Sequence, residues 1–264
     1  MKDILSEIVL NKKAEVVQQK ELLPLHELEK QLLQRKDAIK FRSLKEALLN
    51  SKTGIIAEFK RRSPSKGWLH EHANVNEVTK AYENAGASAL SVLTDQNYFG
   101  GTQADLNNAV QNVQIPVMRK EFIVDEYQIF EAKLMGASAI LLIAAAITQE
   151  ESKRFTKLAN ELQLDVLLEL HDESETDYIT TLNSLVGINN RNLGTFVTDL
   201  QKSFRMAQLL PSDSVWVSES GILDATVVKE LRDAGYRGFL IGEYFMKSGN
   251  PEESLKKFIQ QIEG

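Results

Sequence analysis

The sequence predicts an α/β protein with a single (β/α)8 TIM barrel, because eight short apolar runs alternate with helical stretches and a weak repeat recurs. Strands that alternate with helices indicate parallel βαβ units, and continuous apolar runs suit strands buried on both faces. The runs are GIIAEF (54–59), ALSVLT (89–94), IPVMR (115–119), AILLIA (139–144), DVLLEL (165–170), SLVGIN (184–189), SVWVSE (214–219) and GFLIGE (238–243). Eight such units favour a closed barrel over residues 54–264.

The internal repeat supports the eightfold count. The segment AGASALSVLT (85–94) resembles MGASAILLIA (135–144) and, more loosely, AGYRGFLIGE (234–243). The glycines in second position of these segments are 50 and 99 residues apart, which matches two and four units of roughly 25 residues. A glycine before an apolar run is also a common helix-to-strand loop, so an open doubly wound sheet is the alternative.

Residues 1–50 are predicted to form a helical extension ahead of the barrel. Apolar residues such as Ile4 and Ile8 recur there at helical spacing. Pro24 interrupts the pattern, so at least two helices are expected. The pattern leaves open whether these helices cover the mouth of the barrel or only its base. The whole chain, residues 1–264, is expected to be one domain.

Composition restricts the class of function. The net charge of −6 disfavours nucleic-acid and anionic membrane partners, so an anionic substrate needs a local positive site. The absence of cysteine excludes disulfides, thiolate metal sites and a cysteine nucleophile. The N-terminus lacks the apolar core of a signal peptide, and the longest apolar run, 139–147, is too short to cross a bilayer of about 30 Å. A cytoplasmic monomer is therefore expected.

Ionisable and amide side chains stand at the carboxyl ends of most of the predicted strands. In a barrel these ends face one active site. They supply Glu58 and Lys60 on the first strand, Lys120 on the third, Glu169 and His171 on the fifth, Asn189 and Arg191 on the sixth, Glu219 on the seventh, and Gly242 and Glu243 on the eighth. So many polar groups at one mouth indicate a catalytic centre.

Each of these groups also has an alternative interpretation without a role in catalysis. The loop KRRSPSK (60–66) could be a solvated basic segment or a nucleic-acid patch, but its place after a strand of an acidic protein favours an anion-binding loop. Lys120 precedes Glu121 and Phe122, where burial would depress its pKa and suit it to acid catalysis. Glu169 needs a partner inside a barrel, which could be purely structural. His171 is interpreted as a residue that binds no metal, because no second histidine stands at ligand spacing.

Two segments with glycine, SESGI and LIGEYFM, form the predicted phosphate site. Ser220 and Gly221 follow the seventh strand, and Gly242 and Glu243 follow the eighth. Phosphate in such barrels binds to these two loops, where glycine lets backbone N–H groups approach. The sequence therefore favours a phosphorylated small-molecule substrate.

At this point the chain resembles the indole-3-glycerol-phosphate synthase family over nearly its whole length. The resemblance rests on IAEFKRRSPSKG (56–67), SVLTDQNYFGG (91–101), PVMRKEFIVDEYQI (116–129), LLELHDESE (167–175), GINNRNL (187–193) and VSESGI (217–222), in this order. The family closes an indole ring on 1-(2-carboxyphenylamino)-1-deoxyribulose 5-phosphate and releases CO2 and water, without a metal or organic cofactor. The resemblance thus implies a cofactor-free carboxy-lyase of tryptophan biosynthesis.

The resemblance also implies residue roles. Lys120 would be the general acid that protonates the ribulose carbonyl during ring closure, and Glu169 would act as acid–base in the later dehydration. Glu58 would assist, and Lys60 would lie near the substrate carboxylate and phosphate. The other implied contacts are Asn189 and Glu219 to the sugar hydroxyls, Ser63 and Arg191 to the carboxylates, Ser220, Gly221, Gly242 and Glu243 to the phosphate, and Phe99, Phe122, Pro64, Leu141, Ile143 and Ile222 to the anthranilate ring.

Two positions depart from the usual pattern of the family. Glu121 stands where the family usually has Asp, so the longer side chain could shift the ion pair that orients Lys120. Tyr244 and Phe245 follow Glu243 where small residues are common, so the last phosphate contact could differ.

Two rival functions are weaker. Another phosphosugar barrel, such as phosphoribosylanthranilate isomerase, typically uses a Cys–Asp pair that this chain cannot supply. A non-catalytic barrel that binds phosphorylated ligands would not need the complete set of charged strand ends.

Overall fold

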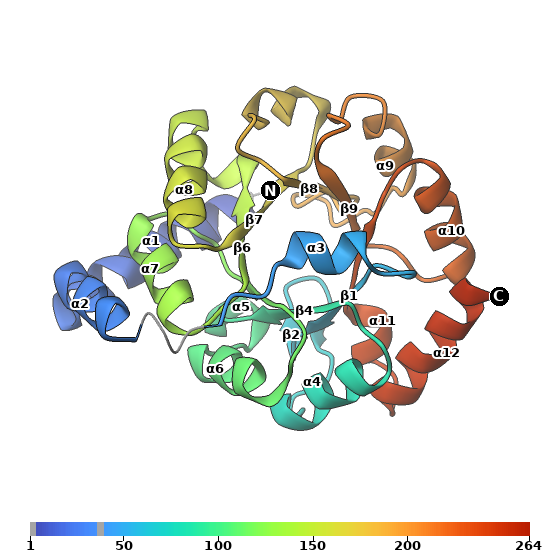
Figure 1. Ribbon diagram of the computed structural model, residues 1–264, viewed down its shortest axis with the longest axis horizontal. Coiled ribbons are helices and arrows are strands. Elements are labelled where there is room, and N and C mark those ends of the chain that lie inside the picture. The colour runs from blue at the N-terminus through green and yellow to red at the C-terminus, as the bar shows by residue number, and fades with distance from the viewer. Residues whose placement is uncertain (1–3, 36–39) are drawn as a thin grey trace.

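The computed structural model describes residues 4–35 and 40–264, in which eight parallel strands close into a barrel (Figure 1). The first barrel strand pairs with both its sequence neighbour and the last strand, which closes the ring. The strands are β1 (Ile55–Phe59), β4 (Ala89–Leu93), β5 (Val117–Lys120), β6 (Ala139–Ile143), β7 (Asp165–Leu170), β8 (Leu185–Asn189), β9 (Val215–Glu219) and β10 (Gly238–Ile241). All eight predicted strands are confirmed, each within two residues of its expected bounds.

Helices connect the strands and form the outer layer (Figure 1). They are α4 (Val75–Asn84), α5 (Gln96–Phe99), α6 (Gln103–Asn112), α7 (Glu126–Leu134), α8 (Gln149–Glu161), α9 (Gln201–Met206), α10 (Ala225–Asp233), α11 (Glu243–Met246) and α12 (Pro251–Glu263), with 3-10 turns η1 (Ala144–Ala146) and η2 (Glu173–Tyr178). Thr102 and Thr148 start α6 and α8 with capping boxes, which satisfy backbone N–H groups that a helix start leaves unpaired. No helix of the described residues is long and apolar enough to cross a membrane.

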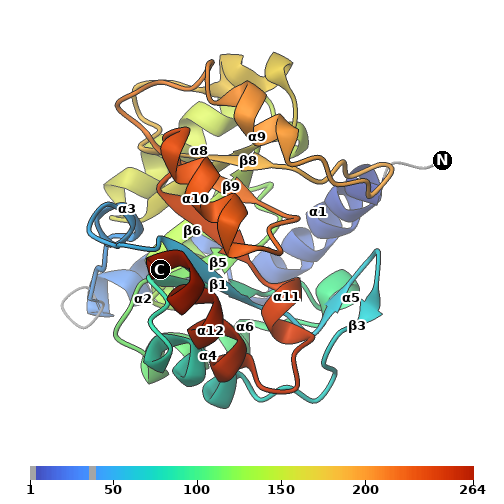
Figure 2. The ribbon, with the colours of Figure 1, turned by 90° about the vertical axis from the view of Figure 1, so that its right-hand side faces the viewer.

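The N-terminal extension contributes α1 (Ile4–Leu22), α2 (Leu25–Arg35) and α3 (Leu44–Leu49). Pro24 separates the first two helices, as predicted. Residues 1–3 and 36–39 of the predicted extension lie outside the described residues. Figure 2 shows α1 and α3 at opposite ends of the barrel.

Helix α3 closes the base of the barrel. Leu44 and Leu48 are fully buried against the inward-facing residues of the strands. Ser43, which caps the helix, donates a hydrogen bond to Asp165 at the start of β7 (2.8 Å). The N-terminal ends of the strands are therefore covered, and the opposite ends are left for the site.

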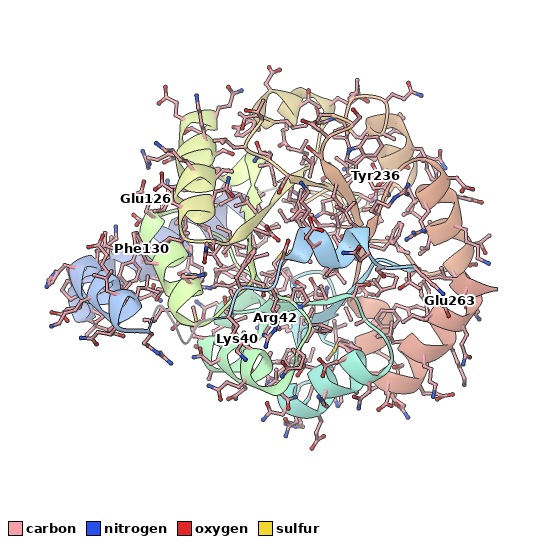
Figure 3. The ribbon with its side chains drawn as sticks, viewed as in Figure 1. Lys40, Arg42, Glu126, Phe130, Tyr236 and Glu263 are labelled. Atoms are coloured by element: carbon pink, nitrogen blue, oxygen red, sulfur yellow. The ribbon has the colours of Figure 1, made fainter. Side chains whose placement is uncertain are left out.

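The core has two layers, one inside the barrel and one between the strands and the outer helices. Leu167, Leu185 and Val217 belong to the inner layer. Tyr236, which Figure 3 labels, belongs to the outer layer and is fully buried. Its hydroxyl donates to the carbonyl oxygen of Ser203 (2.7 Å), so the polar end of this large ring is satisfied.

A short antiparallel hairpin follows β1, with strands β2 (Arg62–Ser63) and β3 (Gly67–Trp68). The apolar pattern of the sequence does not predict it. The hairpin lies at the same end of the barrel as α1 and α5 (Figure 2).

Candidate active site

A cavity of about 640 Å³ opens at the carboxyl ends of the barrel strands. It is lined by every catalytic and substrate-contacting residue that the resemblance implies: Lys120, Glu169, Glu58, Lys60, Asn189, Glu219, Ser63, Arg191, Ser220, Gly221, Gly242, Glu243, Phe99, Phe122, Pro64, Leu141, Ile143 and Ile222. His171 of the strand-end residues does not line it. The strand ends thus bring distant parts of the chain to one mouth, as a barrel requires.

Lys120 lies at the centre of this cavity, at the end of β5. Its Nζ is 2.6 Å from Oε2 of Glu219 on β9 and 3.4 Å from Oε2 of Glu169 on β7. Both carboxylates are almost fully buried, with 1% and 2% of their surface exposed. A buried charge needs such partners, because each unpaired one would cost several kcal/mol, about the whole margin of stability.

The pKa of Lys120 moves in the direction opposite to the one expected from its burial. Burial lowers the pKa, but the carboxylates of Glu219, Glu169 and Glu58 raise it by more than burial lowers it, so the net shift is upward. The expectation of a depressed pKa was therefore wrong, because the sequence does not show that three carboxylates converge on one ammonium. Lys120 is held in its charged, proton-donating form.

The pKa of Glu219 is raised as well, but in a carboxyl a raised pKa favours the neutral, protonated form. Burial and the nearby charge of Glu169 raise its pKa to about 8, against the lowering effect of Lys120. The carboxyl fits because Gly187 lies beside it on β8: a Cβ there would be 2.5 Å from Oε1 of Glu219. Gly187 is thus a functional position that the sequence reasoning missed.

Glu58 and Lys60 form an ion pair at the end of β1. Burial raises the pKa of Glu58, but Lys60 and Lys120 lower it more, so this carboxyl remains ionised. The Glu58 side chain packs closely against Gly242, which follows β10. A Cβ at Gly242 would lie 2.5 Å from Oε1 of Glu58. Glycine at this position therefore makes room for the Glu58 side chain.

Glu169 has two further partners besides Lys120. Asn189 donates a hydrogen bond to its Oε1 (3.1 Å), and Nε2 of His171 lies 3.0 Å from the same oxygen. Burial raises the pKa of Glu169, but Lys120 and His171 lower it more, so the net pKa lies below the usual range. The sequence reasoning gave His171 no role beyond excluding a metal, yet the ring touches the proposed acid–base.

The basic loop after β1 divides into two functions. Arg61 forms a bidentate ion pair with Asp105 (2.7 and 2.8 Å), and Arg62 stacks on the ring of Trp68. Only Lys60 and Lys66 of its four basic residues line the cavity. Only the two lysines of the predicted anion-binding loop therefore face the cavity, whereas Arg61 ties the loop to α6 and Arg62 packs within the hairpin.

The two loops with glycine meet at one side of the cavity. Ser220 and Gly221 both have positive φ values, 68° and 78°, so the chain turns sharply after β9. Arg191 reaches the same region, where its guanidinium pairs with Glu243 (3.3 Å) and donates to Ser65 (3.1 Å). This side offers backbone N–H groups and a paired arginine to an anion. Tyr244 also lines it.

Glu121 does not disturb Lys120, contrary to the shift considered from the sequence. Its carboxylate accepts hydrogen bonds from Thr94 (2.6 Å) and from the backbone N–H of Phe122 (2.9 Å). It also pairs with Lys12 of α1 at 3.2 Å. The longer side chain therefore serves the attachment of the N-terminal helix.

Helix α1 forms part of the site. Ile4, Leu5 and Ile8 line the cavity beside Phe99 and Phe122, whose rings lie 5.9 Å apart. The sequence left the place of this helix open between mouth and base. Its helical spacing of apolar residues predicted a buried face but could not predict what that face covers.

The architecture and the site together define a class. Within residues 4–35 and 40–264, no group of three or more histidine or acidic side chains is arranged to hold a metal ion. A closed parallel barrel with a buried lysine–carboxylate centre and two glycine loops at the same mouth is an α/β-barrel enzyme of organic acid–base chemistry.

The comparison with known sequences specifies the family. The indole-3-glycerol phosphate synthase family is matched over residues 5–258, and the chain belongs to it. The indole-3-glycerol phosphate synthase of Bacteroides thetaiotaomicron is 52% identical over 263 residues, with 100% of both chains covered. That of Aliarcobacter butzleri is 42% identical over 261 residues, with 97% of this chain and 98% of the relative covered.

Solved structures of other proteins share the fold. A tryptophan synthase complex from Pyrococcus furiosus aligns with a TM-score of 0.58 at 14% identity, over 85% of this chain and 100% of the other. Thiamine phosphate pyrophosphorylase from Pyrococcus furiosus aligns with a TM-score of 0.60 at 13% identity, over 81% and 98%. At this identity the likeness concerns the barrel alone.

Proposed function

We propose that the mouth of the barrel catalyses the reaction of its family. The substrate is 1-(2-carboxyphenylamino)-1-deoxyribulose 5-phosphate, and the products are indole-3-glycerol phosphate, CO2 and water. The observation that carries the proposal is the position of Lys120, a charged donor held between Glu169 and Glu219 in a cavity with apolar residues and with the two glycine loops in its wall.

Ring closure needs a proton at the substrate carbonyl. The carbon that bears the carboxylate attacks the carbonyl carbon, and negative charge develops on the carbonyl oxygen. Lys120 supplies a proton there as general acid, because its surrounding carboxylates keep it charged. The carbonyl oxygen becomes a hydroxyl.

Decarboxylation follows in the apolar part of the cavity. Phe99, Phe122, Leu141, Ile143, Pro64 and Ile222 form the surroundings proposed for the anthranilate ring. Loss of CO2 leaves its bonding electron pair in the ring and removes a charge, which a less polar pocket favours. Ser63, nearly buried and lining the cavity, is proposed to lie beside this carboxylate.

Dehydration completes the indole. Glu169 takes a proton from the sugar C1 methylene and, as an acid, gives that proton to the new hydroxyl, which leaves as water. Glu58 is proposed to assist, and Glu219 with Asn189 to hold the sugar hydroxyls. Ionised Glu169 suits the base, and its low pKa is consistent with that assignment.

The phosphate is proposed to bind at the opposite side of the cavity. Ser220, Gly221, Gly242 and Glu243 would offer backbone N–H groups, and Lys60 would add positive charge between phosphate and carboxylate. Arg191 stands beside them and supports the anionic groups. Glu243 points its carboxylate at Arg191 and Lys247, so its negative charge is neutralised before the phosphate arrives.

We also propose that the chain is one domain, acts as a monomer and works in the cytoplasm without a metal or organic cofactor. The N-terminal helices support the first point, because α1 and α3 pack on opposite ends of the same barrel.

The test is direct. The protein is mixed with the carboxyphenylamino-deoxyribulose phosphate in metal-free buffer, and indole fluorescence is followed over time. A rise in fluorescence with one CO2 released per indole is expected. A folded protein that gives no fluorescence with this substrate contradicts the proposal.

A further inference from the structure

The proposed reaction consumes one proton in each turnover. The carbonyl oxygen takes up two protons and leaves as water, whereas the sugar C1 methylene gives up one. The carboxylate departs as CO2 and leaves its electron pair in the ring. One proton must therefore come from solvent, and the acid–base groups must be recharged between turnovers.

The groups that do the acid–base chemistry are poorly connected to water. Glu58, Glu169 and Glu219 are 4%, 2% and 1% exposed. When the substrate fills the cavity, water is excluded from its face of these groups. A connection on another side would allow the proton to enter while the mouth is occupied.

His171 stands on that other side of Glu169, just past the end of β7. Its Nε2 is 3.0 Å from Oε1 of Glu169, and its Nδ1 is 3.9 Å from Oε2 of Glu175. Glu175 lies on η2, with 16% of its side chain exposed against 3% for Glu169. The exposed fraction of the side chain therefore rises from Glu169 through His171 to Glu175.

The ring of His171 lies against Glu169 at 3.0 Å, but its hydrogen-bond geometry is poor. Neither ring nitrogen makes a hydrogen bond of good geometry to the residues that the structure describes, although both are buried. A buried histidine with a purely structural role normally has both nitrogens satisfied. His171 instead lies between two carboxylates, with one ring nitrogen near each of them.

We propose that His171 is a positioning residue that acts through Glu169 and passes the consumed proton to it from the side of Glu175. Once Lys120 has given its proton to the substrate, the charged ring gives the proton on Nε2 to the carboxylate of Glu169, which passes it on to Lys120 across 3.4 Å. The neutral ring then takes a proton from water at its outer edge, beside Glu175. This inference rests on the proposed function, because it needs a reaction that uses up protons.

The charges around the ring suit this task. Burial lowers the pKa of His171, but Glu169 on β7, Glu175 on η2 and Glu219 on β9 raise it more. Lys202 on α9 lies near Glu175 and opposes them in part. The charged ring therefore persists to a higher pH than in free histidine, while Lys120 holds the other oxygen of Glu169.

The test compares His171→Gln with wild type in the indole assay. Glutamine can place an amide donor near the position of Nε2, but it cannot titrate. We expect kcat to fall about tenfold or more with KM within about twofold, and the slowing in D2O to increase, because proton entry becomes limiting. His26→Gln, the same change at an exposed histidine of α2, should match the wild type.

Two further variants separate relay from support. His171→Ala should regain part of its lost kcat when imidazole is added to the buffer, and Glu175→Gln should lower kcat about twofold to threefold. A kcat for His171→Gln within about twofold of wild type, or a loss that imidazole does not restore, would overturn the proposal. Absence of turnover in the wild type would instead overturn the proposed function.

Discussion

Two lysines surrounded by carboxylates lie near the mouth of the barrel, Lys12, which is buried, and Lys120, which is partly buried. Both are charged, but they have different roles. Lys120 is surrounded by Glu219, Glu169 and Glu58, and Lys12 of α1 by Glu15, Asp95 and Glu121. For both lysines burial lowers the pKa, but the carboxylates raise it by more than burial lowers it, so the net shift is upward.

The difference is which of the two lysines faces the cavity. Each cluster has one buried carboxylate oxygen without a hydrogen bond to any described residue, Oδ2 of Asp95 beside Lys12 and Oε1 of Glu219 beside Lys120. Lys120 lines the cavity, whereas Lys12 does not. A buried lysine in a carboxylate cluster is thus a catalytic candidate only where it faces open space.

The largest expected effect is that of Lys120→Met. Turnover should fall by about two to four orders of magnitude, the usual contribution of a general acid, while the fold is kept. Indole fluorescence gives the rate, and circular dichroism checks the fold. Near-normal indole formation by a well-folded variant would remove Lys120 from the role of acid.

Glu169→Gln should cost nearly as much, about two orders of magnitude in kcat, with little change in KM. Glutamine keeps the shape and the contact to Asn189 but cannot accept a proton. Steady-state kinetics at saturating substrate separate the two constants. A raised KM with unchanged kcat would assign Glu169 to binding instead.

Lys12→Met should show the opposite pattern. Turnover should fall less than tenfold, but the free energy of unfolding should drop by about 3 kcal/mol, because Asp95 and Glu121 lose their cation while buried. Urea unfolding measures the loss, and Lys13→Met, an exposed neighbour, should change it by less than about 0.5 kcal/mol.

The Lys12 comparison can be sharpened with a second substitution. Adding Glu121→Gln to Lys12→Met should recover part of the stability, because one unpaired buried charge is then removed. A double variant as unstable as the sum of the two single ones would show that the two residues do not interact.

The last prediction concerns pH. The pKa of Glu219 is raised in the folded state from 4.5 to about 8, so the folded protein holds a proton that the unfolded chain releases between these values. Stability from this group is present below pH 4.5 and is lost as the pH rises toward 8. The free energy of unfolding of Glu219→Gln, relative to that of the wild type, should therefore be larger at pH 9 than at pH 5. An equal difference at both pH values would contradict the raised pKa.

The sequence predicts the framework of this molecule better than its contacts. Strands buried on both faces leave continuous apolar runs, so all eight were found, and a barrel then dictates which ends converge. The positions of the two glycine loops and of the strand-end charges follow from the same rule. This is why the cavity is lined by all the catalytic and substrate-contacting residues that the resemblance implies.

What the sequence could not predict depends on side-chain direction and on distant partners. Lys120 and Glu121 are neighbours that enter different clusters, and Arg61 turns from the cavity to Asp105. The need for a glycine at position 187 can be recognised only once the structure shows Glu219 beside it. The predicted direction of the Lys120 pKa shift was wrong for the same reason, since the shift depends on residues 49 and 99 positions away.

The position of α1 has a consequence for how the protein is made. This helix precedes the barrel along the chain and is synthesised before it, yet its partners come much later: Lys20 binds Asp125 at 2.7 Å, 105 residues further on. Contacts of such sequence separation form late in folding. A helix made before the barrel is therefore among the last elements to dock, and a nascent barrel exposes its apolar mouth until that helix arrives.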